Sequence, residues 1–241
     1  MNRRMKFIPA MFVAAALALA GAVNNAAAQA LIFGDTGSVI GNGLPQELIL
    51  TLSSGGPMTY TTGQNQFDPG VHNQGWWSST YPNYDSNDNI GVGTVEGGGD
   101  VVNDFSTFFL DDLEQGSVVG ATLRINDTGI GRGPFPVTYS LFDVSTDAAT
   151  LNDNSGTSAA IFSDLGSGLQ YASVVLGANP SSPFDVILNA AAVADINSAA
   201  GGYFSIGGTL TPGGAVVPEP TTLALLGIGL AGVGAMRRRK A

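Results

Sequence analysis

The chain has 241 residues, no cysteine and a single histidine, and its formal net charge at pH 7 is −10. The absence of cysteine excludes disulfides, thiol catalysis and Cys-based zinc sites. A single histidine excludes a metal site built from several histidines. Nearly all basic residues lie close to the two ends, so residues 31–217 hold 18 acidic residues against two arginines, a formal charge of −16. Nucleic acid is therefore excluded as a partner, because phosphate recognition needs a basic face.

Residues 1–30 have the three parts of a secretory signal peptide. A basic start at residues 3–6 precedes an uncharged, Ala- and Leu-rich run at residues 7–23, and small residues then provide a cleavage site for signal peptidase. A retained transmembrane helix is the alternative, but the apolar run is short for a span and ends in a cleavable sequence. We therefore expect export across a bacterial inner membrane and a mature protein that begins near Gln29 or Leu31.

Residues 31–210 have the pattern of one all-β domain. Short runs rich in Val, Ile, Thr, Phe and Tyr alternate with clusters of Gly, Asn, Asp and Ser, which are typical of strands and turns. The predicted strands are residues 47–52, 105–110, 118–125, 137–144, 172–176, 184–188 and 203–206. In the third of these runs, alternation places four apolar side chains on one face: Val119, Ala121, Leu123 and Ile125. Strands at such intervals favour a β-sandwich or jelly-roll-like fold over a parallel α/β sheet.

One segment, residues 189–200, predicts a short helix. Ala192, Ile196 and Ala200 recur at helical spacing, while Asn189 suits the N-cap and Gly201-Gly202 suits the end. We expect this helix to lie across an end of the sandwich. After the last strand, the Gly- and Pro-rich residues 211–217 are expected to form a linker between the domain and the C-terminal segment.

Residues 74–89 combine four aromatic side chains with Gln, Asn, Ser and Gly. They are Trp76, Trp77, Tyr81 and Tyr84, and they include both tryptophans of the chain. One interpretation is core and loop packing, in which adjacent strand residues face opposite ways and at most one tryptophan need be buried. The other is a glycan platform, because a sugar offers apolar C–H faces to an aromatic ring and hydroxyls to amide and carboxylate partners.

Asp85, Asn87 and Asp88 place hard oxygen donors close together, as calcium loops do. The run lacks the central Gly and the final Glu of an EF-hand. A second run of the same kind is Asn152-Asp153-Asn154-Ser155-Gly156. Asx-turns give the same composition without a metal. Calcium is thus a candidate ligand of these loops, and no other cofactor is predicted.

The sequence holds few signals for catalysis. His72 is the one histidine available as the base of a Ser-His-Asp triad, and no Gly-x-Ser-x-Gly motif positions a nucleophile. Asp111, Asp112 and Glu114 are candidates for a glycosidase pair, but a polar turn after an aromatic strand explains them better. No catalytic residue is predicted, and we expect the protein not to be an enzyme.

Residues 218–241 form a second targeting signal. Pro218, Glu219 and Pro220 precede an uncharged run at residues 221–236, which the basic residues 237–240 follow. A helix of that length would extend about 24 Å, against a hydrocarbon core of about 30 Å; bilayer thinning and snorkelling of the basic residues make up the difference. The basic cluster is expected to stay in the cytoplasm, which places the domain outside.

This ending resembles the PEP-CTERM sorting signal in its Pro218-Glu219-Pro220 motif, its short span and its Arg-rich tail. The resemblance implies an inner-membrane intermediate held by residues 221–236, from which an exosortase-type enzyme removes the tail. It also implies delivery to the envelope surface or extracellular matrix of a Gram-negative bacterium. A simple tail anchor would not need the Pro-Glu-Pro motif. Two further runs, Asn73-Gln74-Gly75-Trp76-Trp77 and Phe204-Ser205-Ile206-Gly207-Gly208, resemble parts of a β-sandwich found among PEP-CTERM surface proteins.

The favoured interpretation is a non-enzymatic exported protein of the cell surface or extracellular matrix. The alternative is a carbohydrate-binding module that attaches to exopolysaccharide through the aromatic residues of 74–89. A secreted glycan-degrading enzyme is the less favoured third interpretation.

Overall fold

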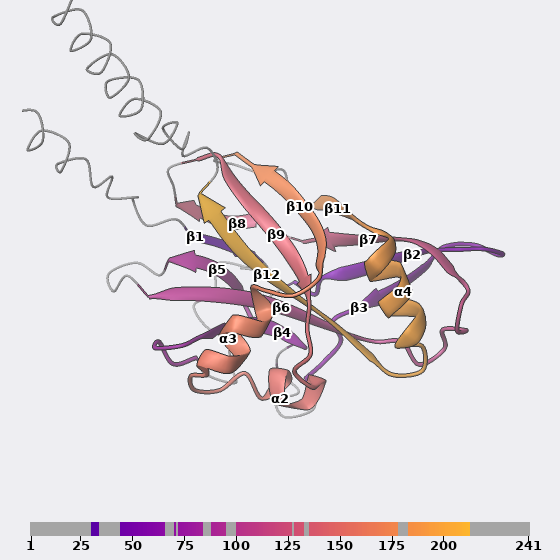
Figure 1. Cartoon of the computed structure of the whole chain (residues 1–241), viewed down its shortest axis with the longest axis horizontal. Coiled ribbons are helices and arrows are strands. Elements are labelled where there is room, and N and C mark those ends of the chain that lie inside the picture. Colours follow the sequence, from indigo (N-terminus) through magenta and orange to yellow (C-terminus); the bar gives the residue numbers. More distant parts are fainter. Residues whose placement is uncertain are drawn as a thin grey trace, which may run out of the picture.

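The computed structural model describes residues 30–33, 44–65, 70, 72–83, 88–94, 100–126, 128–132, 135–177 and 183–212 of the chain. The strands are β1 (Ala30–Phe33), β2 (Glu47–Leu52), β3 (Met58–Thr61), β4 (Gln74–Ser78), β5 (Ile90–Thr94), β6 (Val101–Phe109), β7 (Val118–Ile125), β8 (Thr128–Arg132), β9 (Val137–Asp143), β10 (Gln170–Leu176), β11 (Phe184–Leu188) and β12 (Tyr203–Pro212). The helices are α2 (Ala148–Asp153), α3 (Ala159–Leu165) and α4 (Ala190–Ser198) (Figure 1). Residues 1–29 of the predicted signal peptide and the whole sorting segment lie outside the described residues.

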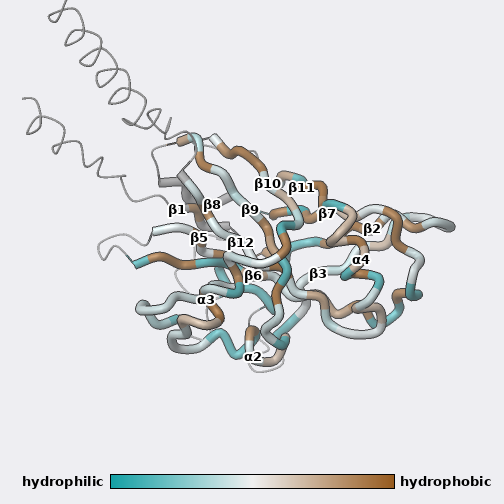
Figure 2. The backbone as a smooth tube through the Cα atoms, viewed as in Figure 1, coloured by the Kyte–Doolittle hydropathy of each residue, from teal (hydrophilic) through white to brown (hydrophobic). Residues whose placement is uncertain are grey.

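The strands form two antiparallel sheets that share a core. The larger sheet has eight strands, in the order β10-β9-β12-β6-β5-β1-β8 with β4 paired to β6 off this path, and the smaller has four, in the order β11-β7-β2-β3. The core combines side chains such as Leu48 and Leu123 of the smaller sheet with Phe108 and Leu141 of the larger. Hydrophobic stretches accordingly follow strands of both sheets (Figure 2). The predicted all-β fold of stacked sheets is confirmed.

Each strand predicted from the sequence is present, and in several of them the apolar alternation matches the burial that the fold imposes. In β2, for example, Leu48 and Leu50 are fully buried while the residues between and beside them are not. The largest difference in length concerns β12, which continues to Pro212 because its second half pairs with β9. Thr211 and Pro212, which the sequence analysis assigned to the linker, therefore belong to the larger sheet.

The prediction for one face of β7 is wrong at Val119. Three of the four apolar side chains assigned to that face are buried, but Val119 is 61 % exposed and Val118 is buried instead. The register of β2 against β7 shifts between Thr51 and Leu52, so that Leu52 lies opposite Val118. A bulge of this kind inserts one unpaired residue and reverses the sides of the residues that precede it.

Two helices that the sequence analysis did not predict cover the other face of the larger sheet. α2 and α3 contact β6 and β12, and their apolar side chains form a second core with that sheet. The members of this second core are Trp77, Phe105, Leu151, Ile161 and Leu165. Asp147 and Ser158 cap the two helices by accepting hydrogen bonds from the backbone N–H groups of Thr150 and Ile161. The prediction of a single helix is wrong, because helices of six and seven residues are too short to show an apolar period.

Gly207 lets α3 approach the larger sheet closely. A Cβ atom at this position would lie 2.6 Å from the carbonyl oxygen and 2.7 Å from the Cα of Leu165, and neither backbone atom can rotate away. We expect Gly207→Ala to lower the free energy of unfolding by about 1–3 kcal/mol, as overpacking does. Urea denaturation measures this change. Gly120→Ala is the matched control, because its Cβ would be 3.5 Å from the Thr51 side chain; equal losses in both variants would contradict the close-approach explanation.

α4 confirms the predicted helix and its N-cap. The Asn189 side chain accepts hydrogen bonds from the backbone N–H groups of Ala191 (3.0 Å) and Ala192 (3.1 Å). Ala192 and Ile196 are fully buried in the main core, and the helix ends at Ser198, two residues earlier than predicted. Its contacts with β7 of one sheet and β10 of the other place it across an end of the sandwich, as expected (Figure 1).

Candidate functional site

β4 places Trp76 and Trp77 on opposite faces of the larger sheet, and both are buried. Trp77 is 3 % exposed in the second core, where its Nε1–H donates to the carbonyl oxygen of Leu151 (3.3 Å). Trp76 is 8 % exposed and stacks on Tyr81, with ring centroids 5.7 Å apart. Its ring also covers Gly91 of β5, where a Cβ atom would lie 3.0 Å from Trp76 Cδ1. Both tryptophans are therefore packing residues.

This burial removes both tryptophans from the predicted glycan platform of Trp76, Trp77, Tyr81 and Tyr84. A sugar stacks on a ring whose face is open to solvent, and neither tryptophan offers one. Tyr81 is exposed but is stacked on Trp76, and Tyr84 lies outside the described residues. In a two-layer sandwich one of two adjacent residues faces solvent, whereas here α2 and α3 cover the face on which Trp77 lies.

Asp88 is fully buried and holds His72. Its Oδ2 accepts a hydrogen bond from the backbone N–H of His72 (2.9 Å) and lies 2.7 Å from His72 Nδ1. Within the described residues, no three His, Asp or Glu side chains come together as a metal site would require. Asp85 and Asn87 lie outside those residues. Calcium at Asp85, Asn87 and Asp88 stays a prediction, and the structure gives His72 a structural partner.

The second candidate calcium run, residues 152–156, joins α2 to the loops on either side of β4. Asn154 ends α2 with a left-handed backbone (φ 46°), and its Oδ1 accepts a hydrogen bond from Asn83 Nδ2 (2.8 Å). Its side chain lies against Gly75 of β4, where a Cβ atom would overlap it. The backbone oxygen of Asn152 accepts a hydrogen bond from Asn65 Nδ2 (2.5 Å). These are tertiary hydrogen bonds between segments far apart in the sequence, and calcium at residues 152–156 stays a prediction.

The polar residues around β4 form an internal hydrogen-bond network centred on Gln74. Gln74 Oε1 accepts from the Thr62 hydroxyl (2.7 Å) and from the backbone N–H of Gln46 (3.1 Å). Its Nε2 donates to the backbone oxygens of Asp88 (3.0 Å) and Leu44 (3.1 Å). All four hydrogen-bonding positions of this buried amide are thus satisfied. The polar side chains that suggested a binding surface lie in the interior instead.

Asp104 is a buried titratable residue that the sequence analysis missed. Both of its carboxyl oxygens accept from the Tyr139 hydroxyl, at 3.1 and 2.9 Å. Burial raises the pKa of Asp104 to about 8, although the hydrogen bond from Tyr139 acts to lower it. Gly208 of β12 lies at the place where they meet, and a Cβ atom there would overlap both side chains. A Gly pair inside a strand was the available signal, since it often marks such a close approach.

Two further tyrosine–aspartate pairs tie the ends of the fold together. The Tyr60 hydroxyl donates to Asp112 Oδ1 (2.6 Å), and the Tyr171 hydroxyl donates to Asp195 Oδ2 of α4 (2.7 Å). Burial, followed by the neighbouring carboxylate, raises the pKa of each tyrosine. Residues 111–112 form the polar turn that the sequence analysis favoured over a glycosidase pair.

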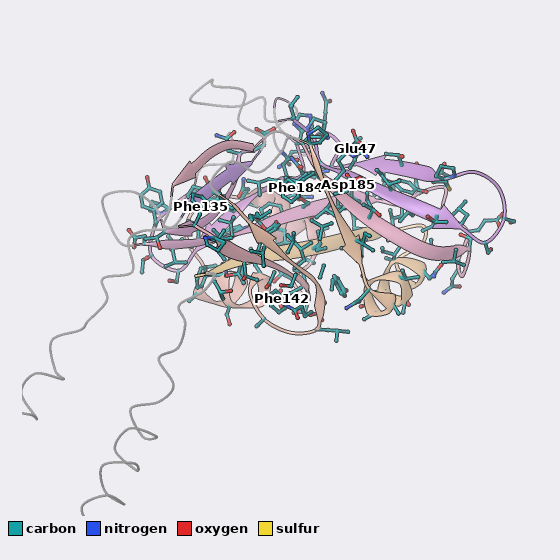
Figure 3. The ribbon with its side chains drawn as sticks, turned by 90° about the horizontal axis from the view of Figure 1, so that it is seen from above. Glu47, Phe135, Phe142, Phe184 and Asp185 are labelled. Carbon is teal, nitrogen blue, oxygen red and sulfur yellow. The ribbon has the colours of Figure 1, made fainter. Side chains whose placement is uncertain are left out.

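An ion-pair row crosses the smaller sheet on its solvent side. Arg124 of β7 donates through Nε to Asp185 Oδ1 of β11 (2.8 Å), and its Nη1 lies 3.7 Å from Glu47 Oε2 of β2. Glu47 and Asp185, both labelled in Figure 3, lie on the two strands that flank β7. The hydrogen bond from Arg124 lowers the pKa of Asp185. Among the side chains that the structure describes, Arg124 is the one arginine or lysine, and this row occupies it.

One aromatic pair does remain open to solvent. Phe109 at the end of β6 lies opposite Tyr203 at the start of β12, with ring centroids 4.7 Å apart and an interplanar angle of 40°. Phe109 is 47 % exposed and Tyr203 is 46 % exposed. We call Phe109 and Tyr203 the aromatic pair. Both residues lie in strands that the sequence predicts, but only the register of β6 against β12 brings them together.

The described residues contain no helix that is long and apolar enough to cross a membrane. The predicted span at residues 221–236 lies outside them. An acidic two-sheet domain followed by a Pro-rich segment, an apolar run and a basic cluster defines the chain as an exported protein with a C-terminal sorting segment.

The PEP-CTERM protein-sorting motif matches residues 216–240. The chain therefore carries a PEP-CTERM sorting motif, which indicates an exported protein that an exosortase-type system processes. No curated protein and no solved structure matches it.

Proposed function

We propose that the protein is a non-enzymatic component of the cell surface or extracellular matrix. The sorting motif at residues 216–240 is the observation that carries the proposal. β12 ends at Pro212, so that only residues 213–215 separate the folded domain from the matched segment. Signal peptidase at the N-terminus and an exosortase-type enzyme at the motif would together release a domain that keeps all its strands.

The roles of the acidic side chains support a structural protein. Asp104 and Asp112 accept hydrogen bonds from tyrosines, and Asp88 accepts one from the backbone of His72. Asp195 joins α4 to β10, and Asp185 joins β11 to β7. Each of these carboxyl groups connects two parts of the fold. The remaining negative charge favours solubility outside the cell.

A carbohydrate-binding module is the second candidate function, and the aromatic pair is the observation that favours it. The burial of Trp76 and Trp77 removes the residues that first suggested it. Phe109 and Tyr203 supply the exposed rings that stacking on a sugar requires. Attachment to exopolysaccharide then depends on this pair alone among the described aromatic contacts.

Mass spectrometry of the intact envelope protein tests the sorting step. We expect the species isolated from wild-type cells to lack residues 237–240 and to end near Pro218-Glu219-Pro220, because the prolines keep this segment extended and accessible to an enzyme. A variant with Pro218→Ala, Glu219→Ala and Pro220→Ala is expected to keep Ala241 and to remain in the inner-membrane fraction.

Gly213→Ala is the matched control, because Gly213 lies outside the residues that match the motif. This variant is expected to be processed and delivered like the wild type. An envelope species of wild-type protein that ends at Ala241 would contradict the proposal, and so would normal processing of the triple variant.

A further inference from the structure

The aromatic pair is a continuous apolar surface on the helix-covered side of the larger sheet. Thr107 and Ser205 form the next cross-strand row on the same face, and their hydroxyl oxygens are 3.0 Å apart. Phe105 and Gly207 form the row after that, where α3 packs. Since Phe109 and Tyr203 keep almost half of their surfaces exposed, the helices leave this end of the face open.

The aromatic pair lies at the end of the domain opposite to Ala30 and Pro212, which are the described residues nearest to the two predicted targeting segments. Tyr203 begins β12 and Pro212 ends it, and nine strand residues span about 30 Å. Ala30 pairs with Gly93 of β5, which pairs with Val102, at the other end of β6 from Phe109. The start of β1 and the end of β12 accordingly lie on the same side of the molecule (Figure 1).

The charges around the aromatic pair select the kind of polymer that could stack there. The turn that follows Phe109 exposes Asp111 and Glu114, while Asp112 between them accepts the hydrogen bond from Tyr60. Arg124 is engaged on the smaller sheet. A polymer with uronate or sulfate groups would be repelled by this surface, whereas sugar hydroxyls or amines can donate hydrogen bonds to the carboxylates.

We propose that the aromatic pair is a binding site for an uncharged or amine-bearing polysaccharide, whose pyranose rings stack on Phe109 and Tyr203. The inference rests on the proposed location at the cell surface, where such polymers are encountered. Stacking uses the apolar C–H face of the sugar, and the adjacent carboxylates orient its donors. A site that consists of two rings without a cleft binds each sugar weakly. Its affinity for a long polysaccharide is higher, because the repeating units offer many equivalent binding positions.

Affinity electrophoresis of the processed protein tests this site. The gels contain hydroxyethyl cellulose, chitosan or alginate as the uncharged, amine-bearing and acidic probes. We expect at least one of the first two polymers to retard the wild-type protein and alginate not to. Phe109→Ala and Tyr203→Ala are each expected to weaken binding about 3- to 10-fold, as the loss of one aromatic contact does. Tyr203→Phe keeps the ring and is expected to keep binding.

Val175→Ala and Ile187→Ala are the matched controls, because these apolar side chains are 66 % and 80 % exposed but lie on β10 and β11. Both controls should bind like the wild type. Binding to alginate alone, binding to none of the three polymers, or binding unchanged in the Phe109→Ala, Tyr203→Ala double variant would overturn the proposal.

Two further measurements separate the possible failures. The envelope fraction of cells that express the double variant shows whether the variant is still sorted to the envelope. This measurement distinguishes a failure of sorting from a loss of the polysaccharide-binding site. Sedimentation velocity shows whether the aromatic pair instead joins two copies of the chain. A wild-type dimer that the double variant abolishes, without polysaccharide binding, would also overturn the proposal.

Discussion

Trp77→Ala is expected to lower the free energy of unfolding by about 3–5 kcal/mol. Trp77 is the large side chain between β4 and the short helices, in contact with a second core that also holds Phe105 and Leu151. Truncation leaves a cavity there, and it removes the donor to the carbonyl oxygen of Leu151. Urea denaturation followed by far-UV circular dichroism measures the loss without relying on the fluorescence of the deleted residue.

Tyr81→Ala is the matched control for this experiment. Tyr81 belongs to the same polar and aromatic segment, but it is 41 % exposed and contacts Trp76 through one ring face. Its truncation is expected to cost about 1 kcal/mol or less. If Trp77→Ala cost no more than Tyr81→Ala, α2 and α3 would not form a stable layer on the sheet, and the glycan interpretation of Trp77 would have to be considered again.

The strands with the clearest sequence signal are those whose two faces meet different surroundings. β7 and β11 have the predicted bounds, because one face of each packs into the main core and the other meets solvent. Apolar and polar residues therefore alternate along the sequence of these strands. Even there the bulge opposite Leu52 could not be foreseen, since it depends on the register between β2 and β7.

β4 was not predicted, because it has no solvent face to produce alternation and no continuous run of apolar residues. All five of its residues are buried, so polar, small and aromatic side chains follow one another without a period. β5 is interrupted by Gly91 and Gly93, and Gly91 accommodates the ring of Trp76. In both strands the residue types are determined by contacts with residues far away in the sequence, and no local pattern reveals those contacts.

The candidate site depended on the same missing information. Aromatic side chains in polar company suggested an exposed platform at Trp76 and Trp77, yet that polarity belongs to the internal network around Gln74. Phe109 and Tyr203 looked like ordinary strand residues. Only the pairing of β6 with β12, and the limited extent of the helical layer, leaves these two rings exposed side by side.

Wild-type stability is expected to fall as the pH rises from 5 to 8, and Asp104→Asn is expected to remove most of this fall. The pKa of Asp104 is about 8 in the folded protein and about 3.9 in an unfolded chain. Between these two values the folded state holds a proton that the unfolded state releases, so that stability decreases with pH. Its contribution is complete below about pH 4 and is lost as the pH rises through 8, at about 1.4 kcal/mol per pH unit. For a domain of this size the melting temperature should fall by roughly 3–6 °C per unit.

Comparison of wild type and variant at each pH isolates Asp104, since every other titrating group is common to both. An amide at this position does not ionise, and its oxygen still accepts the hydrogen bond from Tyr139. Melting curves recorded at intervals from pH 5 to 8 should therefore diverge, and parallel curves would show that the carboxyl is ionised throughout. Tyr139→Phe gives a second, independent test. Because the Tyr139 hydrogen bond lowers the pKa of Asp104, its removal should raise that pKa further and extend the decline in stability to higher pH.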